Sequence, residues 1–420
     1  MAAQQSGDRE EAAMFETERR FDLYGDGFKR DPHPTFAAMR REAPIWQQAG
    51  LNGTTPIWFV TRYADVDAML RDKRFVRDAA LAHDPADLPP EPELFRRIGQ
   101  HMLNRDGVDH QRLRGLVSQA FTPRRVAQMR PRIRAIAEGL LEPLEGRGSM
   151  ELIRDFAFPL PTAVILEMLG VPGEDRDLVR VWGNALLAPP RDAEEGRRLE
   201  AQLVEFADYV AALVEERRAR PRDDLLSDLV AAEEAGDRLS LDELLSTLVL
   251  LITAGHETTV NLIANAVLAL SRHPHVRDAL AVDPTAMPAA VEELLRFDGP
   301  VERALNRWAA EDVVWGGQTI RRGDPVILIL GSANRDPERF EAADALDPAR
   351  TPNPHLAFGK GPHYCMGAPL ARLEGEIALN ALLARLPRLR VAVSDDALRY
   401  RFLPGFRALE ALPVAWDVPG

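Results

Sequence analysis

Cysteine is almost missing from this sequence: Cys365 is the only one among 420 residues. A lone thiol excludes an internal disulfide and any zinc or iron–sulfur site built from several cysteines. Cys365 is therefore an inert core residue, a nucleophile or a single metal ligand. A nucleophile needs a base, and His363 lies two residues away without an evident Asn or Asp partner.

Positive charge is also in short supply, with 52 Lys and Arg residues against 65 Asp and Glu residues and a formal net charge of −13. Nucleic-acid binding draws on an excess of Lys and Arg, so this balance argues against nucleic acid as the main partner. The sequence shows no secretion signal at its start, because residues 1–20 are polar and charged. We expect those residues to form a flexible N-terminal segment.

A long uninterrupted hydrophobic run is absent as well. The longest apolar stretch, 244–270, contains His256, Glu257, Asn261 and Asn265. Polar residues at these positions argue against a membrane span and favour a buried core helix. We therefore expect a cytoplasmic protein that has no membrane partner.

Helical patterns dominate what is present, and the predicted fold class is mainly α with a small β region. The clearest pattern begins at Ser240, which forms a capping box with Glu243, and continues to Ser271. It predicts a helix of about 48 Å that runs through the centre of the molecule. Further helices are expected over residues 35–42, 109–120, 123–145, 154–170, 173–220 (broken near 188), 285–297 and 368–386. Short strands are expected over 313–330, 389–394 and 398–416.

The lone cysteine lies in a glycine-rich loop just before one of these helices. Gly359 and Gly361 permit backbone conformations that other residues avoid, and they let the main chain approach a ligand closely. The helix after Cys365 would place its positive end and free N–H groups near the sulfur, which lowers the pKa of a thiol. The loop therefore suits a thiolate that binds a large, flat group.

The same loop resembles the haem-binding loop of cytochromes P-450. All six fixed positions of that loop are matched, by Phe358, Gly359, Gly361, His363, Cys365 and Gly367. The resemblance implies that Cys365 is the proximal thiolate ligand of the iron of haem b, with the other five residues around the cofactor. Met366 stands where many bacterial members have Leu, a departure that should not affect ligation.

A second motif, Ala254-Gly-His-Glu-Thr-Thr259, falls at the midpoint of the long helix. Glycine inside a helix costs about 1 kcal/mol relative to alanine, so Gly255 needs a reason, and room for a ligand is the simplest. His256-Glu257 invites comparison with a zinc protease, but that motif requires a second histidine where Val260 stands. Taken alone, the string is also compatible with a buried, satisfied polar cluster.

This motif is similar to the oxygen-binding groove of cytochromes P-450. The resemblance implies that Ala254 and Gly255 lie over the haem and that Thr258 hydrogen-bonds dioxygen and its accompanying water. Glu257 then connects the groove to a proton supply. Splitting the O–O bond takes two protons in a water-poor pocket, which is why an acid and an alcohol stand side by side.

Other charged residues match supporting positions of the same family. Glu293 and Arg296 share a helical face, and with Arg350 they are expected to form a structural network that holds the haem loop. Four residues are implied as partners of the haem propionates, although any of them could instead be surface charge: His110, Arg114, Arg307 and His363.

The motifs occur in family order, and the resemblance covers residues 30–415. It implies a single domain over 21–420, with an α-rich lobe, a small β lobe and the long helix over a haem held from beneath by the cysteine loop. The implied enzyme is a soluble bacterial monooxygenase that takes electrons from NAD(P)H through a reductase and a ferredoxin or flavodoxin. Two alternatives stay open: a relative that uses peroxide or rearranges substrates without dioxygen, and a haem carrier or sensor without turnover.

Family placement also suggests where substrate and electron donor bind. The substrate pocket is expected to draw on Leu250, Ala254 and the segments 76–102, 173–205, 301–305 and 403–406. The small organic substrate is expected to be apolar: a polyketide or macrolide, a terpenoid, a steroid or a fatty acid. The acidic donor is expected to dock near Arg112, Lys360 and Arg372.

Overall fold

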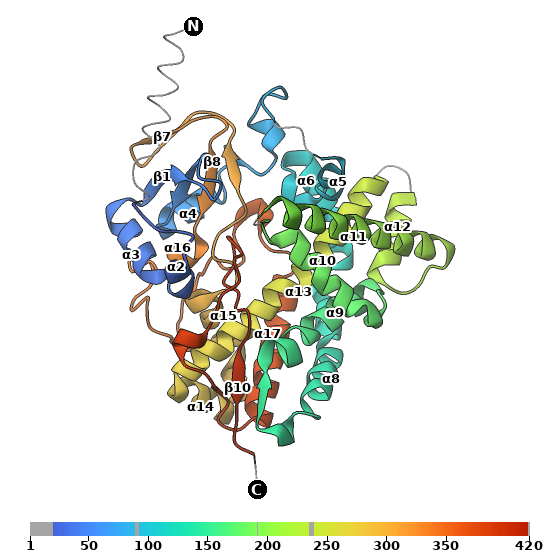
Figure 1. Ribbon diagram of the computed structural model, residues 1–420, viewed down its shortest axis with the longest axis vertical. Coiled ribbons are helices and arrows are strands. Elements are labelled where there is room, and N and C mark those ends of the chain that lie inside the picture. Colours follow the sequence, from blue (N-terminus) through green and yellow to red (C-terminus); the bar gives the residue numbers. More distant parts are fainter. Residues whose placement is uncertain (1–19, 89–91, 191, 235–238, 419–420) are drawn as a thin grey trace. The chain divides into compact units, whose positions relative to one another are not determined.

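The computed structural model describes residues 20–88, 92–190, 192–234 and 239–418 (Figure 1). The expected flexible segment therefore lies outside the described residues, apart from residue 20. The chain divides into two compact units. Among the described residues, the β-rich unit contains 20–88, Val301–Asp344 and Gly359–His363, and the helical unit contains the remainder.

The β-rich unit is built on one mixed sheet of five strands. Their order is β1 (Ile45–Ala49), β2 (Pro56–Val60), β8 (Pro325–Leu328), β5 (Arg307–Ala309) and β3 (Phe75–Val76). Only β2 and β8 are parallel, because a long crossover separates them in sequence. A hairpin of β6 (Val313–Trp315) and β7 (Gln318–Ile320) follows β5. The helices of this unit are α2 (Asp26–Arg30), α3 (His33–Glu42), α4 (Tyr63–Met69) and α16 (Leu330–Ala333).

The helical unit carries most of the core. Its helices are α5 (Glu93–Ile98), α6 (Gly107–Ala120), α7 (Pro123–Gln128), α8 (Arg130–Leu141), α9 (Pro159–Leu169), α10 (Arg176–Leu187), α11 (Ala193–Ala219), α12 (Leu225–Glu234), α13 (Leu241–Arg272), α14 (Pro274–Val282), α15 (Met287–Asp298) and α17 (Ala368–Arg385). A small antiparallel sheet joins β4 (Ser149–Glu151), β10 (Pro413–Ala415) and β9 (Arg390–Val391).

Helix α13 is the central element of the helical unit, where it contacts α5, α9, α11, α15 and α17 (Figure 1). The predicted capping box is confirmed: the Glu243 N–H donates to Ser240 Oγ at 3.2 Å, and the Ser240 N–H donates to Glu243 Oε2 at 2.8 Å. The helix is long and apolar enough to cross a membrane, but 83% of its most hydrophobic stretch of 18 residues is buried inside the fold. That degree of burial is typical of a core helix.

Two sequence expectations on secondary structure are wrong in detail. The single helix expected over 123–145 is divided into α7 and α8, and α8 starts anew with Pro131 in its first turn. Proline lacks the N–H that an unbroken helix would use at that position. Within 398–416, β10 is the only strand, and a lone bridge pairs Tyr400 with Leu409. Pro404-Gly405 interrupts any longer ladder there.

Candidate functional site

One strip of α13 is left uncovered in the middle of an otherwise enclosed helix. Between Leu244 and Leu270, every residue is buried except Leu250, Ala254, Gly255 and Thr258. Leu250, Ala254 and Thr258 are spaced four apart, so they lie on one face of the helix. A buried helix that exposes one apolar strip with a hydroxyl at its end has the form of one wall of a ligand site.

The glycine of this motif packs against a neighbouring helix. A Cβ atom on Gly255 would lie 2.6 Å from Cγ1 and 2.8 Å from Cδ1 of Ile165. Ile165 belongs to α9, which packs tightly against α13 at this point. Helix packing therefore gives Gly255 a cause of its own, and the expectation that it makes room for a ligand stays a prediction.

Two further polar residues of the motif, Thr258 and Glu257, have different environments. Thr258 is half-buried, and its hydroxyl donates to the carbonyl of Ala254 at 3.0 Å. Glu257 is only 5% exposed. An unpaired carboxylate at that depth would be strongly destabilising, so it needs partners.

Glu257 has two such partners, neither of which the sequence analysis selected as a site residue. Its Oε1 accepts hydrogen bonds from Arg401 and, at 3.3 Å, from Nδ2 of Asn261. Arg401 also donates to Oδ1 of Asn184 in α10, so one guanidinium joins the acid to that helix. Among the described residues, no hydrogen bond reaches Oε2 of Glu257. The spacing of four between Glu257 and Asn261 was a readable signal, whereas Arg401 gave none.

His256 is a packing residue. It is 1% exposed, its Nδ1 lies 2.7 Å from the carbonyl oxygen of Ile252, and its ring meets Phe158 edge-on. Burial lowers the pKa of this histidine, which keeps the ring neutral. A Cβ on Gly183 of α10 would come within 3.3 Å of the His256 ring. His256 therefore forms a contact between α13 and α10. The hydrogen bonds of Arg401 to Glu257 and Asn184 link the same two helices.

The cysteine loop supplies an exposed thiol. The Cys365 N–H donates to the carbonyl of Phe358 at 2.9 Å, and Arg114 of α6 donates to the carbonyl of Tyr364 at 2.7 Å. Although part of the Cys365 surface is open to solvent, the protein around it removes enough water to raise the pKa of the thiol. The N–H groups of Gly367 and Ala368 and the charge of Arg114 act in the opposite direction. The expected donors are thus in place, but burial outweighs them, so the expected net lowering of the thiol pKa is wrong.

The two loop glycines behave as predicted. Gly359 and Gly361 have φ angles of 67° and 73°, in the region that favours glycine. At Gly361 a Cβ would also lie 2.7 Å from the carbonyl oxygen of Leu70, within the β-rich unit. Both glycines are therefore required by the backbone conformation of the loop.

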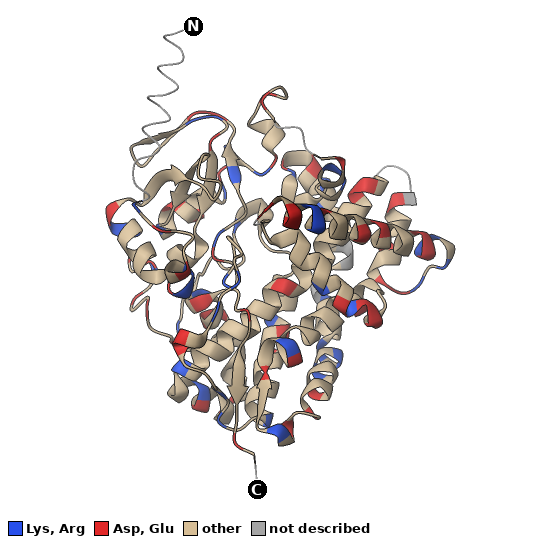
Figure 2. Cartoon of the chain, in the orientation of Figure 1, with Lys and Arg blue, Asp and Glu red and all other residues tan. Residues whose placement is uncertain are grey.

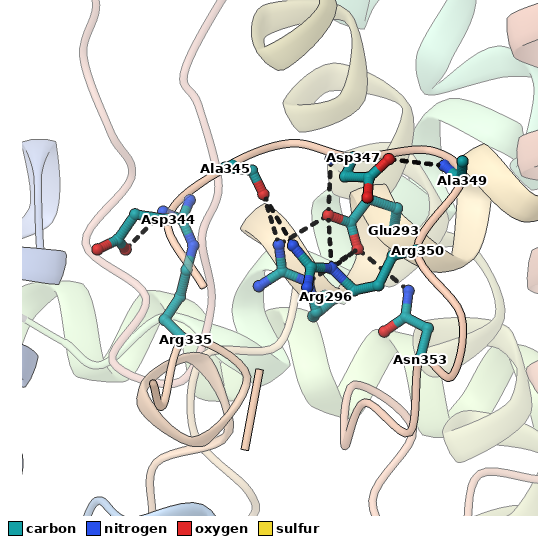
Figure 3. A network of polar contacts seen from close by, with 9 residues as sticks. All are labelled: Glu293, Arg296, Arg335, Asp344, Ala345, Asp347, Ala349, Arg350 and Asn353. Atoms are coloured by element: carbon teal, nitrogen blue, oxygen red, sulfur yellow. Dashed lines mark hydrogen bonds and ion pairs between the residues drawn. The ribbon is translucent and has the colours of Figure 1, made fainter. Parts of the chain in front are cut away.

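Glu293 of α15 is the centre of the polar network shown in Figure 3. Its carboxylate accepts from Arg296 at 2.7 and 2.8 Å, from Arg350 at 3.1 Å and from the Asp347 N–H at 2.9 Å. Burial opposes ionisation, but hydrogen bonds from Arg296 and Asp347 and the charges of both arginines lower the pKa of Glu293. Asn353 donates to the same carboxylate at 3.1 Å. The structure thus joins the three residues grouped by the sequence analysis and adds Asp347 and Asn353.

The four implied propionate residues are divided between the units. His110 is buried on α6, and Arg114 lies one turn further along the same helix beside the cysteine loop. Arg307 is buried at the start of β5, and His363 ends the 3₁₀ turn Gly361–His363. Their role toward a propionate stays a prediction.

The three cations expected to receive an electron donor each have an acidic partner. Arg112 pairs with Glu243, Lys360 with Asp67 at 2.7 Å, and Arg372 with Glu292 at 2.6 Å. In Figure 2, basic and acidic segments alternate along the helices of the helical unit. These pairs reduce the positive charge that the three residues can offer to a partner.

The segments expected to line the substrate pocket fall on several elements. Leu250 and Ala254 belong to the uncovered strip, while 173–205, with residue 191 not described, contains α10 and the first half of α11. Residues 403–406 are irregular in the helical unit, and 301–305 belong to the β-rich unit. The segment 76–102 is described except for residues 89–91.

The residues present fit haem. An exposed thiol follows a loop of glycines with positive φ, Arg114 lies beside it, and α13 offers a flat apolar strip that ends in a hydroxyl. A single soft thiolate is one of the axial ligands that proteins use for haem iron.

Comparison with known proteins agrees with this geometry. The family model described as Cytochrome P450 matches residues 182–283 and 285–392. Polyketide biosynthesis cytochrome P450 PksS of Bacillus subtilis is 43% identical over 94% of this chain and 98% of its own length. Vitamin D(3) 25-hydroxylase of Pseudonocardia autotrophica is 44% identical over 94% of this chain and 96% of its own. The crystal structure of myxobacterial CYP267B1 in complex with myristic acid superposes with a TM-score of 0.89, at 43% identity over 94% and 98% of the two chains.

The chain belongs to the cytochrome P450 family. The predicted fold class, mainly α with a small β region, is confirmed. Members of this family bind haem b, and the chain is a P450 monooxygenase.

Proposed function

We propose that this enzyme inserts one oxygen atom from O2 into an apolar small molecule, by hydroxylation or epoxidation. Electrons come from NAD(P)H through a reductase and a ferredoxin or flavodoxin, in the cytoplasm. The observation that carries the proposal is the uncovered strip of α13, which places an apolar surface directly next to the Glu257–Thr258 pair.

Cys365 is the residue that would hold the haem iron, with Phe358, Gly359 and Gly367 around it and Ala254 on the opposite face. His110, Arg114, Arg307 and His363 would bind the propionates. Thiolate-ligated haem supplies the redox chemistry: with dioxygen, two electrons and two protons it brings about cleavage of the O–O bond. The residues of the protein would bind the substrate and deliver the protons.

Thr258 and Glu257 are the residues that would deliver the two protons. The Thr258 hydroxyl donates to the Ala254 carbonyl, so its oxygen can still accept a hydrogen bond from a water at the uncovered strip. Glu257 has its Oε1 occupied by Arg401 and Asn261, so Oε2 is the oxygen that can take up and release a proton. The arrangement is that of a general acid that recharges a neighbouring alcohol.

The substrate is expected to be apolar because Leu250 and Ala254 form the strip beside Thr258. Two relatives that are 43% and 44% identical to this chain have names that refer to polyketide biosynthesis and to vitamin D3. A similar solved structure, 43% identical, contains myristic acid. All three point to large, mostly apolar molecules. We accordingly propose a polyketide or macrolide, a terpenoid, a steroid or a fatty acid.

The proposal is tested by turnover with a surrogate ferredoxin, its reductase and NADPH against a panel of these four classes, under ¹⁸O-labelled dioxygen. The expected result is a product that carries one labelled oxygen. Turnover with peroxide alone would favour the peroxide-using alternative. Binding of panel members, seen as a shift of the haem spectrum, with no turnover under either condition would favour a haem carrier.

A further inference from the structure

Glu292, one residue before the Glu293 network, is the centre of a second and separate cluster. Arg372 of α17 donates to it through two nitrogens, with Nε–Oε1 at 2.6 Å and Nη2–Oε2 at 2.8 Å. His355 Nε2 lies 3.0 Å from Oε2, and its side chain is only 3% exposed. Burial opposes ionisation, yet the hydrogen bonds from His355 and Arg372 lower the pKa of Glu292 to about 2. The carboxylate is therefore charged at any physiological pH.

This cluster reaches both flanks of the cysteine loop. On the upstream side, the Arg372 guanidinium lies over the Phe358 ring at 4.5 Å, and His355 accepts from the Ala357 N–H at 3.2 Å. On the downstream side, Arg372 donates to the Tyr364 hydroxyl at 3.1 Å. A planar guanidinium with one carboxylate, one ring and one hydroxyl as partners is held in a single orientation.

We propose that Arg372 and Glu292 are positioning residues for Cys365: they clamp the two flanks of its loop to α15 and set the charge near its sulfur. Although 36% of its side chain is exposed, Arg372 is consequently engaged by partners within the chain and is not a docking cation for the electron donor. The inference rests on the proposed function, because it takes Cys365 to be the haem ligand.

If Arg372 and Glu292 act on Cys365, changing either residue should shift the reduction potential of the iron, which a purely structural contact would not do. Hydrogen bonds and charges around a thiolate tune the potential of the iron that it binds. Removing the charge of Arg372 takes a positive charge away from the loop and leaves Glu292 without its cationic partner, which stabilises the oxidised iron and lowers the reduction potential. Removing the charge of Glu292 leaves Arg372 positive and raises it. The two changes therefore act in opposite directions, and together they nearly cancel.

The experiment compares Arg372→Met, Glu292→Gln and the double variant as haem-loaded proteins, by redox titration and by the spectrum of the reduced carbon monoxide complex. We expect opposite shifts of the potential in the single variants and a smaller shift in the double variant. Each single variant should also lose part of the strongly red-shifted Soret band, because the loop is less well held. Arg372→Lys keeps the charge but not the two-pronged contact, so it should lose band intensity with little change in potential.

Arg130→Met is the matched control, since Arg130 of α8 also forms a two-pronged pair with a glutamate of α17, Glu376, and has no part in the proposed site. It should leave the potential and the Soret band unchanged. If Arg372→Met raised the apparent KM for the donor while potential and band stayed as in the wild type, Arg372 would be a docking cation and the inference would be overturned. That result would leave the proposed function intact. A red-shifted band that survived Cys365→Ala would instead overturn the haem ligation itself.

Discussion

The guanidinium of Arg401 binds the carboxylate of Glu257, although 144 positions separate the two residues in sequence. The same guanidinium holds Asn184 of α10, and α10 also meets α13 where Gly183 faces His256. The acid proposed to deliver protons is thus fixed by a residue near the end of the chain. Its environment depends on the position of a helix expected to contribute to the substrate pocket.

Arg401→Gln is expected to lower the fraction of NADPH electrons that appear in product, by several-fold. The reason is that a carboxylate without its cationic partner loses the orientation that leaves Oε2 available. Product and NADPH are measured in the same reaction. Peroxide-driven turnover, which needs no delivered proton, serves as the control and should change little. Unaltered coupling would show that Arg401 has no part in proton delivery.

Thr258→Ala and Glu257→Gln are expected to impair the NADPH-driven reaction more strongly. General acid–base groups contribute about 10²- to 10⁴-fold to a rate, so a loss of at least about tenfold in product formation is expected for each variant. Oxygen consumption should continue and yield peroxide in the Thr258→Ala variant. Thr258→Ser keeps the hydroxyl and is the matched control. Tight coupling in Thr258→Ala would refute the proton-delivery role.

Gly255→Ala is expected to destabilise the fold, although alanine is the better helix former. The new methyl group would collide with Ile165, and such overpacking costs about 1–3 kcal/mol against a gain of about 1 kcal/mol in helix propensity. The free energy of unfolding by urea measures the balance. Ile165→Val in the same chain should recover part of the loss. An unchanged or increased stability of Gly255→Ala would mean that α9 adjusts at no cost.

Glu374 of α17 is expected to make the stability of the fold depend on pH. It is completely buried, and neither carboxylate oxygen has a hydrogen-bond partner among the described residues. Burial raises its pKa from an ordinary value of 4.5 to about 8, against a smaller opposing effect of the nearby Thr259 hydroxyl. Between these two pH values the unfolded chain has released the proton that the folded chain keeps, so this contribution to stability falls as the pH rises and levels off above about 8.

Glu374→Gln should remove that part of the pH dependence, because glutamine has nearly the same shape and does not titrate. Urea unfolding at a series of pH values from about 5 to about 8.5 gives the slope for both proteins. Identical slopes would show that Glu374 is already ionised in the folded protein.

Much of the chain was predictable because its signals are local. Helix α13 follows from a capping box and a continuous apolar pattern, and it begins and ends within one residue of the prediction. The cysteine loop is likewise contained in ten consecutive residues. The fold class follows from such segments, because each carries its own periodicity.

The sequence could not predict contacts between residues that are far apart in the chain, because no repeating pattern connects their segments. The partner of Glu257 comes from an irregular stretch near the C-terminus, and Glu292 finds Arg372 eighty positions away. The packing contact of Gly255 was missed for the same reason, because Ile165 belongs to another helix. Likewise, Arg372 reads as a surface cation until its carboxylate and ring partners are seen.

The central claim is that Cys365 binds haem iron as a thiolate, and the most direct test is the absorption spectrum of the purified protein, reduced with dithionite under carbon monoxide. A strongly red-shifted Soret band that disappears in Cys365→Ala is the predicted result. A band at the position typical of histidine-ligated haem, or no haem band at all, would contradict it.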